Sequence, residues 1–477
     1  MQNIKGWARS KPPNNRARST PRYQIADFKE SVGKSAIEFE RLLAQYNYKT
    51  LWTYAVNCIL GLWLILSPFV YDYKSAELVT SDTISGALII LFEFLAFSPH
   101  RAKLRWLTPA VAFWLLLAPL VFWSPTPAVY LVDTLIACLV IAFSVLVPGV
   151  PGRAGVELVG PDQPPGWTYN PSSWIRRWLG IGLALVGFFI SRYLAAHQLG
   201  YIPHAWDPFF GNGSDKVLTS AVSRSFPISD AGFGGVAYIM EVLTGFMGDR
   251  ARWRSAPWIA VMFALLVLPL GVTSVILVIT QPIIVGSWCG LCLIAAAALL
   301  ASVPLAVHEA VAVGQFLLEA KANKMDLWQV FWMGGSIFRA GKEDPDRTHY
   351  TCDQRWIASV QGVTVPSTIF AQLVIGMWLM ARPDLFPFIG TSSANCDHLL
   401  GAMVVTVAAV ATAEVTRIAR LVNIPLGLAL IVVAFLFAAD VPVVFWSEII
   451  SGIALILLSI PRGEIIERYA GWDKFVK

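Results

Sequence analysis

The chain has 477 residues, of which 56% are hydrophobic and 14% are charged, and its mean hydropathy is +0.60. Soluble globular domains carry about a quarter charged residues. The composition therefore excludes a water-soluble domain and indicates a polytopic membrane protein. The formal net charge is +5.

The first 50 residues are polar and precede the first apolar run. Residues 1–22 carry six basic side chains and no acidic one. Such a segment buries no core and is attracted to anionic lipid headgroups. We predict a disordered cytoplasmic tail here and no signal peptide. Nucleic-acid binding is a weaker alternative, and we expect no such partner.

Twelve apolar runs follow along the chain. Several are shorter than the ~20 residues of a membrane-spanning helix, so they need flanking residues to cross a bilayer. Their boundaries are soft for that reason. The runs cover residues 51–70, 84–97, 107–123, 129–147, 178–190, 233–247, 257–279, 288–307, 368–381, 399–413, 425–439 and 443–460.

Lysine and arginine predict the orientation, because cytoplasmic loops of membrane proteins are enriched in both. With the N-terminus inside and twelve spans, 31 of the 36 basic residues lie in inside segments. The other five are Lys74, Arg192, Lys216, Arg224 and Arg382. We therefore expect both termini on the cytoplasmic side.

The first four and the last four runs share an internal repeat. Gly61 precedes Gly86 by 25 residues, and Gly376 precedes Gly401 by the same number. Each first glycine is followed by the same Trp-Leu pair and then by a proline. Membrane helices approach closely through small residues. Each unit is therefore predicted to be a helical hairpin in which the two glycines face each other.

These hairpins resemble the SPW-repeat family of small bacterial membrane proteins. Ser67 and Pro68 supply the Ser-Pro part of its signature, while the other copies depart from it. The resemblance covers residues 51–147 and 368–460. It implies an architecture and says little about chemistry.

Two polar segments separate the blocks. Residues 148–173 are rich in proline and glycine, and residues 311–365 become charged from Lys321 onward. In the second segment, Trp328, Phe331 and Trp332 indicate either a helix on the membrane surface or a buried aromatic cluster. The predicted division is a basic tail (1–50), a four-helix block (51–147), a linker (148–173), a central block (174–310), a linker (311–365), a second outer block (366–461) and a cytoplasmic tail (462–477).

Cys289 and Cys292 open the eighth run, on the predicted outer side. Two cysteines three positions apart lie within one helical turn, close enough to form a disulfide or to share a metal. A helix N-terminus also stabilises a thiolate. This arrangement suggests electron exchange between aqueous thiols and a lipid-soluble carrier. The alternative is that both are small apolar packing residues.

The central block resembles the vitamin K epoxide reductase family, including its bacterial members that oxidise disulfide-forming proteins and reduce quinone. One matching motif is residues 288–293, with the sequence WCGLCL. The other is residues 214–220, SDKVLTS, followed by Phe233-Gly234. The order of the spans, the long outer segment and the basic inner turn also match.

The resemblance implies roles for five residues. Cys289 and Cys292 match the active dithiol, with Cys289 exchanging with an incoming thiol and Cys292 nearer the quinone. Ser220, Asp230 and Tyr238 fall near positions that line or support the quinone pocket. A helix cap is an equal alternative for Ser220. The implied cofactor is a quinone of the ubiquinone or menaquinone class.

The sequence departs from this family in the outer loop, where two further cysteines usually relay electrons. The second would align with Ser214 and the first would lie within 206–208, yet residues 193–288 contain no cysteine. Without the relay, a partner thiol must meet Cys289 directly. We therefore expect Cys289 to be open to water, with the 200–232 segment forming a groove. Cys292 should border an apolar cavity, with Ser220 at its edge.

Other polar residues offer weaker sites. Cys396 is the remaining outer cysteine and could replace the relay, although a lone thiol is the simpler interpretation. His204, Asp207 and Asp215 share the outer loop and could hold a cation. The histidines show no paired spacing, and we predict no metal site.

The predicted fold is an all-α polytopic membrane protein with about twelve transmembrane helices in three four-helix blocks, the central one resembling vitamin K epoxide reductase. The predicted function is a membrane oxidoreductase that couples dithiol oxidation at the outer face to quinone reduction. Its expected location is a bacterial inner membrane, and its partners are lipid, quinone and an extracytoplasmic thiol protein. Alternatives are a non-catalytic scaffold or quinone- or lipid-binding module, and a transporter. Transporters of this size usually show two related halves.

Overall fold

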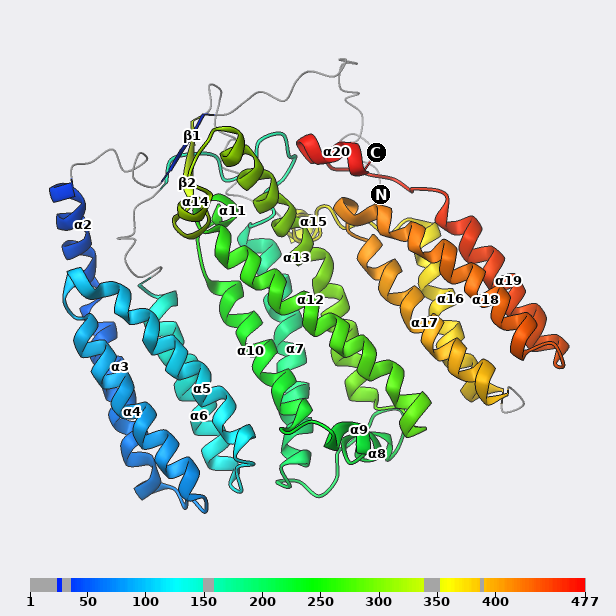
Figure 1. The fold of residues 1–477 in the computed structure, drawn as a ribbon, viewed down its shortest axis with the longest axis horizontal. Helices are drawn as coiled ribbons and strands as arrows, with labels where there is room; N and C mark the ends of the chain where they lie inside the picture. Colours follow the sequence, from blue (N-terminus) through cyan, green and yellow to red (C-terminus); the bar gives the residue numbers. More distant parts are fainter. Residues whose placement is uncertain (1–23, 28–35, 149–157, 339–351, 387–389, 477) are drawn as a thin grey trace.

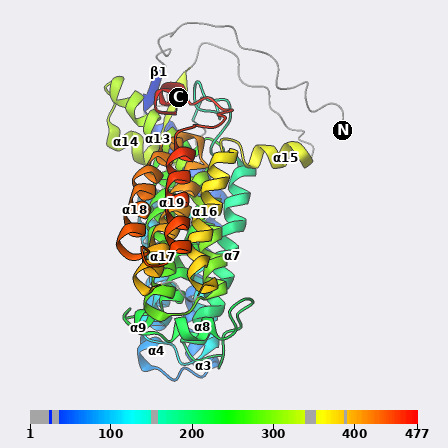
Figure 2. The same cartoon turned by 90° about the vertical axis from the view of Figure 1, so that its right-hand side faces the viewer.

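The computed structural model describes residues 24–27, 36–148, 158–338, 352–386 and 390–476. Its long helices form three groups in a row, each made of consecutive chain segments (Figure 1). Figure 2 shows the row from its end, with the helices running in a common direction. Within the described part, ten helices are long and apolar enough to cross a membrane. The remaining two predicted runs form the helices α10 (Asp230–Phe246) and α16 (Ser367–Leu385), so the all-α membrane fold is confirmed.

The first block consists of two helical hairpins. In the first hairpin, Gly61 and Gly86 face each other across the helix pair. A Cβ atom added to Gly61 would lie 2.8 Å from the Gly86 carbonyl oxygen. The predicted glycine contact is thus confirmed. The helices are α3 (Leu51–Val70), α4 (Ala76–Ala96), α5 (Leu107–Val121) and α6 (Pro127–Ile141), with the 3-10 helix η1 (Pro99–Trp106) and the π-helix η2 (Ala142–Leu146).

The third block repeats this plan. Gly376 faces Gly401 in its first hairpin, and Gly427 faces Gly452 in its second, where a built Cβ would lie 2.6 Å from the opposite carbonyl oxygen. Side chains larger than hydrogen would push these helices apart. The helices are α16 (Ser367–Leu385), α17 (Thr391–Ala411), α18 (Asn423–Phe437) and α19 (Pro442–Ser459), and η4 (Glu414–Val422) joins the two hairpins.

The middle block packs α10 on α7, and both α7 and α12 on α13. At one end of this bundle, Arg252 forms two hydrogen bonds of 2.6 Å with the Glu309 carboxylate. Both groups are buried, so each compensates the charge of the other. The helices are α7 (Trp174–Gln198), α8 (Gly213–Leu218), α9 (Ala221–Arg224), α10 (Asp230–Phe246), α11 (Arg252–Ser255), α12 (Pro257–Thr280), η3 (Gln281–Val285) and α13 (Gly290–Ala322).

Small elements gather near α11, at the upper ends of the helices in Figure 1, while α8 and α9 lie at the lower ends. This separation fits an alternating path of helices across one layer. The elements near α11 include a two-stranded antiparallel sheet of β1 (Gln24–Asp27) and β2 (Gly335–Phe338). The others are α2 (Ala36–Lys49), α14 (Leu327–Met333), α15 (Cys352–Ser359), η5 (Ala470–Trp472) and α20 (Asp473–Val476).

The sequence did not predict the strand β1 or the helix α2, both of which lie in the 1–50 segment. The predicted disorder of 1–22 concerns residues outside the described ranges. For 311–365 both interpretations hold in part. Trp328 is well exposed, as a surface helix requires, whereas Phe331 packs against the main core.

Both outer blocks contact the middle block near α8 and α9. On one side, Arg192 donates to the Thr134 hydroxyl at 2.8 Å, and Tyr201 donates to the Ser124 carbonyl at 2.7 Å. On the other side, the Trp288 indole donates to the Asp384 carboxylate at 2.5 Å. The residue next to Cys289 is therefore fixed by a contact with the third block.

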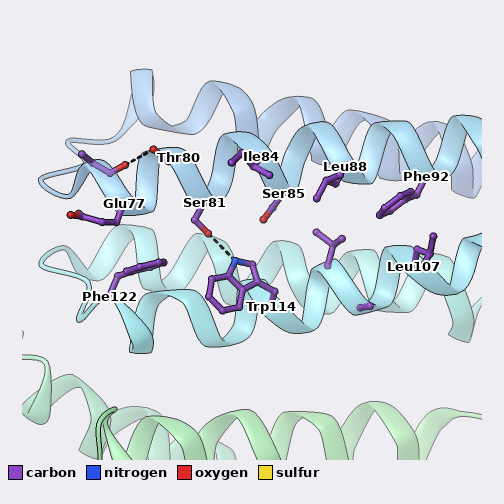
Figure 3. A pocket seen from close by; sticks show the side chains of 13 residues that line it. Glu77, Thr80, Ser81, Ile84, Ser85, Leu88, Phe92, Leu107, Trp114 and Phe122 are labelled. Atoms are coloured by element: carbon purple, nitrogen blue, oxygen red, sulfur yellow. Dashed lines mark hydrogen bonds between the residues drawn. The ribbon is translucent and has the colours of Figure 1, made fainter.

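A groove of about 860 Å³ lies on the first block between α4 and α5 (Figure 3). Its walls are mostly apolar, and the Trp114 indole donates to the Ser81 hydroxyl at 3.0 Å across it. All of its lining residues belong to the first block, so it is separate from the cysteine pair of the middle block.

Candidate functional site

The cysteine pair lies at the N-terminus of α13. Cys289 is the N-cap residue in an extended conformation, and its sulfur accepts a hydrogen bond of 3.2 Å from the Cys292 amide. The two cysteines form a disulfide, with their Cα atoms 5.3 Å apart. Free amides at a helix N-terminus favour negative charge on a capping sulfur. The site can therefore stabilise a Cys289 thiolate when the disulfide opens.

Asp207 fixes the outer loop to this helix end. Its Oδ2 accepts from the Gly290 amide at 2.9 Å, and its Oδ1 accepts from the Phe209 and Phe210 amides, both at 2.9 Å. A carboxylate at this point also interacts favourably with the helix dipole. Asp207 thus joins the loop and α13 through one charged group.

Ser214 sits between this carboxylate and the disulfide. Its hydroxyl oxygen lies 2.8 Å from Asp207 Oδ2 and 3.2 Å from Cys289 Sγ. The hydroxyl has one proton, and an ionised carboxylate is a stronger acceptor than a disulfide sulfur. Ser214 therefore donates to Asp207 and directs its oxygen at the sulfur of Cys289. A reduced Cys289 thiol could in turn donate to Ser214.

The close approach of the loop depends on two glycines. A Cβ atom at Gly290 would lie 2.6 Å from Asp207 Oδ1 and 3.0 Å from the Phe209 ring. A Cβ at Gly213 would overlap the Trp288 carbonyl oxygen. The glycine inside the Cys-x-x-Cys motif is thus needed to admit Asp207.

The pKa of Asp207 is lowered. Burial opposes ionisation, but hydrogen bonds from the Gly290, Phe209 and Phe210 amides and from Ser214 outweigh it. Asp207 is therefore ionised at neutral pH and acts as a hydrogen-bond acceptor, not as a base.

Asp215 follows Ser214 in the chain, but its carboxylate contacts His204 and the Ala205 amide and not the helix end at Cys289. Burial again opposes ionisation, but the Ala205 amide together with His204 and His197 lowers its pKa. Asp207 faces α13 instead of this group, so the cation site proposed from the two aspartates and His204 does not assemble. Among the described residues, no group of three or more His, Cys, Asp or Glu side chains is placed to hold a metal.

The expected open groove over Cys289 is wrong for this structure. Cys289 is fully buried, and Ser214 and Asp207 cover it. Gln281 closes a further side by accepting from the Cys289 amide at 2.9 Å. Cys292 is the more exposed of the pair. The loop can lie this close to the Cys289 sulfur because Gly290 has no side chain, which lets Asp207 reach the backbone amide of Gly290.

Ser220 caps α9, as its alternative interpretation predicts. Its hydroxyl accepts from the Ser223 amide at 3.3 Å and donates to the Val217 carbonyl at 2.7 Å. Ser223 in turn donates to Asp230 Oδ1 at 3.0 Å. The structure thus brings Ser220 and Asp230 together through Ser223.

Tyr238 lies further along α10 and is buried. Its hydroxyl donates to the Ala295 carbonyl of α13 at 3.1 Å, and its ring fills the space left by Gly187. Tyr238 therefore joins three helices at the level of the turn after Cys292.

Apolar side chains surround the pair. Cys289 packs in a cluster with Leu194 and Leu218, and both Cys292 and Ala231 border this cluster. Asp230, which precedes Ala231, accepts its three hydrogen bonds through Oδ1 alone. Cys292 thus adjoins an apolar cluster, and Asp230 is the chain neighbour of Ala231, which borders the same cluster.

Sequence reasoning overlooked Asp207 as a partner of the disulfide. The signal was its position, seven residues before Ser214 and inside the interval expected for the missing first loop cysteine. In the structure, the Asp207–Ser214 hydrogen bond joins the two places where a disulfide relay was expected.

Comparison with family models gives two matches. The model of the vitamin K epoxide reductase family matches residues 178–307. The SPW repeat domain matches residues 51–147 and 368–461. The chain contains a vitamin K epoxide reductase family domain flanked by two SPW repeat domains. No curated protein and no solved structure matches the chain. The vitamin K epoxide reductase family suggests a membrane redox enzyme of the thiol-oxidoreductase and quinone type.

Proposed function

We propose that this protein is a membrane thiol-disulfide oxidoreductase that couples oxidation of a dithiol at the outer face to reduction of a quinone. The observation that carries this proposal is the Cys289–Cys292 disulfide at the N-terminus of α13, with Ser214 against the Cys289 sulfur. The proposed location is a bacterial inner membrane with both termini in the cytoplasm, which the distribution of basic residues supports.

The exchange step uses the disulfide as the electron acceptor. A thiolate of an extracytoplasmic partner protein attacks Cys289 Sγ, the bond to Cys292 breaks, and Cys292 leaves as a thiolate. The second thiol of the partner then displaces Cys289 and forms the partner's disulfide. The two cysteines retain the two electrons, and the helix N-terminus stabilises the Cys289 thiolate.

The loop must move for this exchange, because Cys289 is fully buried. Asp207 controls the movement, since its hydrogen bonds join the loop to the Gly290 amide and to Ser214. Ser214 stands where the family usually has a cysteine. It cannot relay electrons, so the partner thiol must itself reach Cys289 when the loop opens.

The apolar surroundings of Cys292 support a quinone site there. An apolar cluster adjoins the sulfur, and Asp230 lies next to Ala231 at the border of that cluster. Such a combination of apolar walls and one polar group is typical of cofactor sites. A bound quinone supplies the oxidant, taking up the two electrons and two protons that the dithiol gives up. Tyr238 supports the pocket by fixing α10 against α13.

A non-catalytic module that binds quinone or lipid is the alternative. The complete burial of Cys289 and the serine at position 214 favour it. The two functions differ in one respect, because only the oxidoreductase forms a covalent intermediate with a partner thiol.

Cys292→Ser tests the proposal through the reverse exchange: the free Cys289 thiolate attacks the disulfide of an oxidised partner, one partner sulfur leaves as a thiolate, and no Cys292 thiol is present to displace the partner from Cys289. After acid quenching of cells, this variant is expected to show a thiol-sensitive adduct through Cys289 on non-reducing gels. Adding Cys289→Ser should abolish the adduct, whereas adding Cys396→Ser should leave it. Absence of any adduct, with alkylation of the reduced Cys292 thiol that added quinone does not slow, would refute the oxidoreductase and leave a non-catalytic module.

A further inference from the structure

The two SPW blocks correspond residue by residue at a constant separation of 315 positions. The hairpin glycines Gly61 and Gly376 are this far apart, and so are Arg105 and Arg420. The correspondence continues without gaps from Asn57 and Gln372 to Ser144 and Ser459. One block can therefore be compared with the other as a second copy of the same fold.

In the third block, the Arg382 guanidinium contacts two buried carboxylates, those of Asp397 and Glu448. Arg382 Nε lies 3.1 Å from Asp397 Oδ2, and its Nη2 lies 3.0 Å from Glu448 Oε1. Ser393 also donates to Glu448 at 2.6 Å. All four side chains are buried. The guanidinium supplies one positive charge between two carboxyl groups.

The first block keeps both acids and lacks the cation. Asp82 corresponds to Asp397 and Asp133 to Glu448, while Ser67 stands at the position of Arg382. Asp82 and Asp133 are fully buried and lie close enough for each carboxyl group to affect the ionisation of the other. In the described part of the chain, neither carboxylate oxygen of Asp133 has a hydrogen-bond partner, and Asp82 Oδ1 has none either.

Nearby groups do not replace the missing charge. Tyr73 donates to Asp82 Oδ2 at 2.5 Å and contacts the Ser67 hydroxyl at 2.9 Å. Tyr201 lies close enough to interact electrostatically with Asp133 but is neutral. Arg192 contacts Tyr130 and Thr134 of α6 instead.

Two adjacent carboxylates inside a membrane layer cannot both remain ionised without compensation. A single proton would give this pair the same formal charge as the third-block pair with Arg382. Hard divalent cations take six or more oxygen ligands. The Ser67 hydroxyl is already bonded to Tyr73 and to the Leu64 carbonyl. The site is therefore better suited to a proton than to a metal ion.

We propose that Asp82 and Asp133 form a proton-binding site in the first SPW domain, at the place where Arg382 puts a fixed charge in the third block. The proton is shared between the two carboxyl groups. It exchanges with the adjoining aqueous phase through Tyr73, which is partly exposed and bonded to Asp82.

Infrared spectroscopy of the full-length protein in lipid nanodiscs tests this site. The carbonyl stretch of a protonated carboxyl is expected at neutral pH, with shifts both in heavy water and on heavy-isotope labelling of the aspartate carboxyl carbons. The labelling shift needs no mutation, and it excludes glutamates such as Glu241. Absence of a label-sensitive band would overturn the proposal.

Four variants then assign the band. Asp133→Asn and Asp82→Asn should each remove it. The neutral amide has the shape and charge of a protonated carboxyl, so the remaining aspartate no longer needs the proton. Asp397→Asn should retain it, since Arg382 compensates that site. Arg382→Ser should add a second band by recreating the first-block arrangement. If sodium ions remove the band at constant pH, or if Asp397→Asn alone removes it, the proton site is refuted.

Discussion

The substitution Asp207→Asn tests how the loop covers Cys289. Asp207 accepts four hydrogen bonds, from Ser214 and from the Gly290, Phe209 and Phe210 amides. Each carboxylate oxygen of Asp207 accepts two of these bonds. An asparagine has only one acceptor oxygen, so its NH₂ group must face two of the four donors. Two bonds are then lost, each contributing roughly 1.5–3 kcal/mol because the acceptor is charged.

A loss of about 3 kcal/mol corresponds to a roughly hundredfold change in the opening equilibrium. Because Cys289 is reached only after the loop opens, we expect a small phosphine to reduce the disulfide at least about tenfold faster in Asp207→Asn. The rate can be followed in nanodiscs by quenching, alkylation and mass shift.

Asp215→Asn is the matched control. It makes the same chemical change in the same loop, where Asp215 contacts Ala205 and His204 and not α13. Its disulfide should be reduced at nearly the wild-type rate. Equal rates in Asp207→Asn and the wild type, or equal acceleration by both substitutions, would refute the role of Asp207.

Three further outcomes are expected. A cysteine at Lys216 should react with an impermeant reagent outside whole cells and one at Lys321 should not; the reverse pattern would invert the topology. Gly376→Ala should lower stability by about 1–3 kcal/mol in thermal unfolding, because the added methyl meets the opposite helix, whereas Gly182→Ala, with open space around it, should be nearly neutral. Because the pKa of Asp207 is lowered below its ordinary 3.8, its stabilisation of the loop is present above that pH and is lost as the pH falls further; reduction by a phosphine should therefore accelerate below about pH 4, and an acceleration already complete near pH 6 would contradict this.

The helical hairpins were predictable because their constraint is local and periodic. A hydrophobic run defines a membrane helix, and a glycine repeated at a fixed spacing indicates where two helices touch. Gly61 and Gly86 could therefore be paired from sequence. The β1–β2 pairing joins residues more than 300 positions apart, and such short polar strands carry no periodic signal.

The site was only partly predictable. The motif placed Cys289 and Cys292 at a helix start, where the structure also has them. It did not show that Asp207 covers Cys289, because that contact depends on the path of an irregular loop. Ser220 carried two interpretations, and its observed bonds are those of a helix cap. The missing loop cysteines pointed to an open site, whereas a hydrogen-bonded cap occupies that space.

The redox state of Cys289 and Cys292 in native membranes tests the central claim most directly. Rapid acid quenching followed by alkylation and mass analysis distinguishes the disulfide from the dithiol. Electron transfer to quinone predicts a mainly oxidised pair in ordinary cells and an accumulation of the dithiol when quinone synthesis is blocked. A pair whose oxidation state is the same with and without quinone would contradict the proposed oxidoreductase.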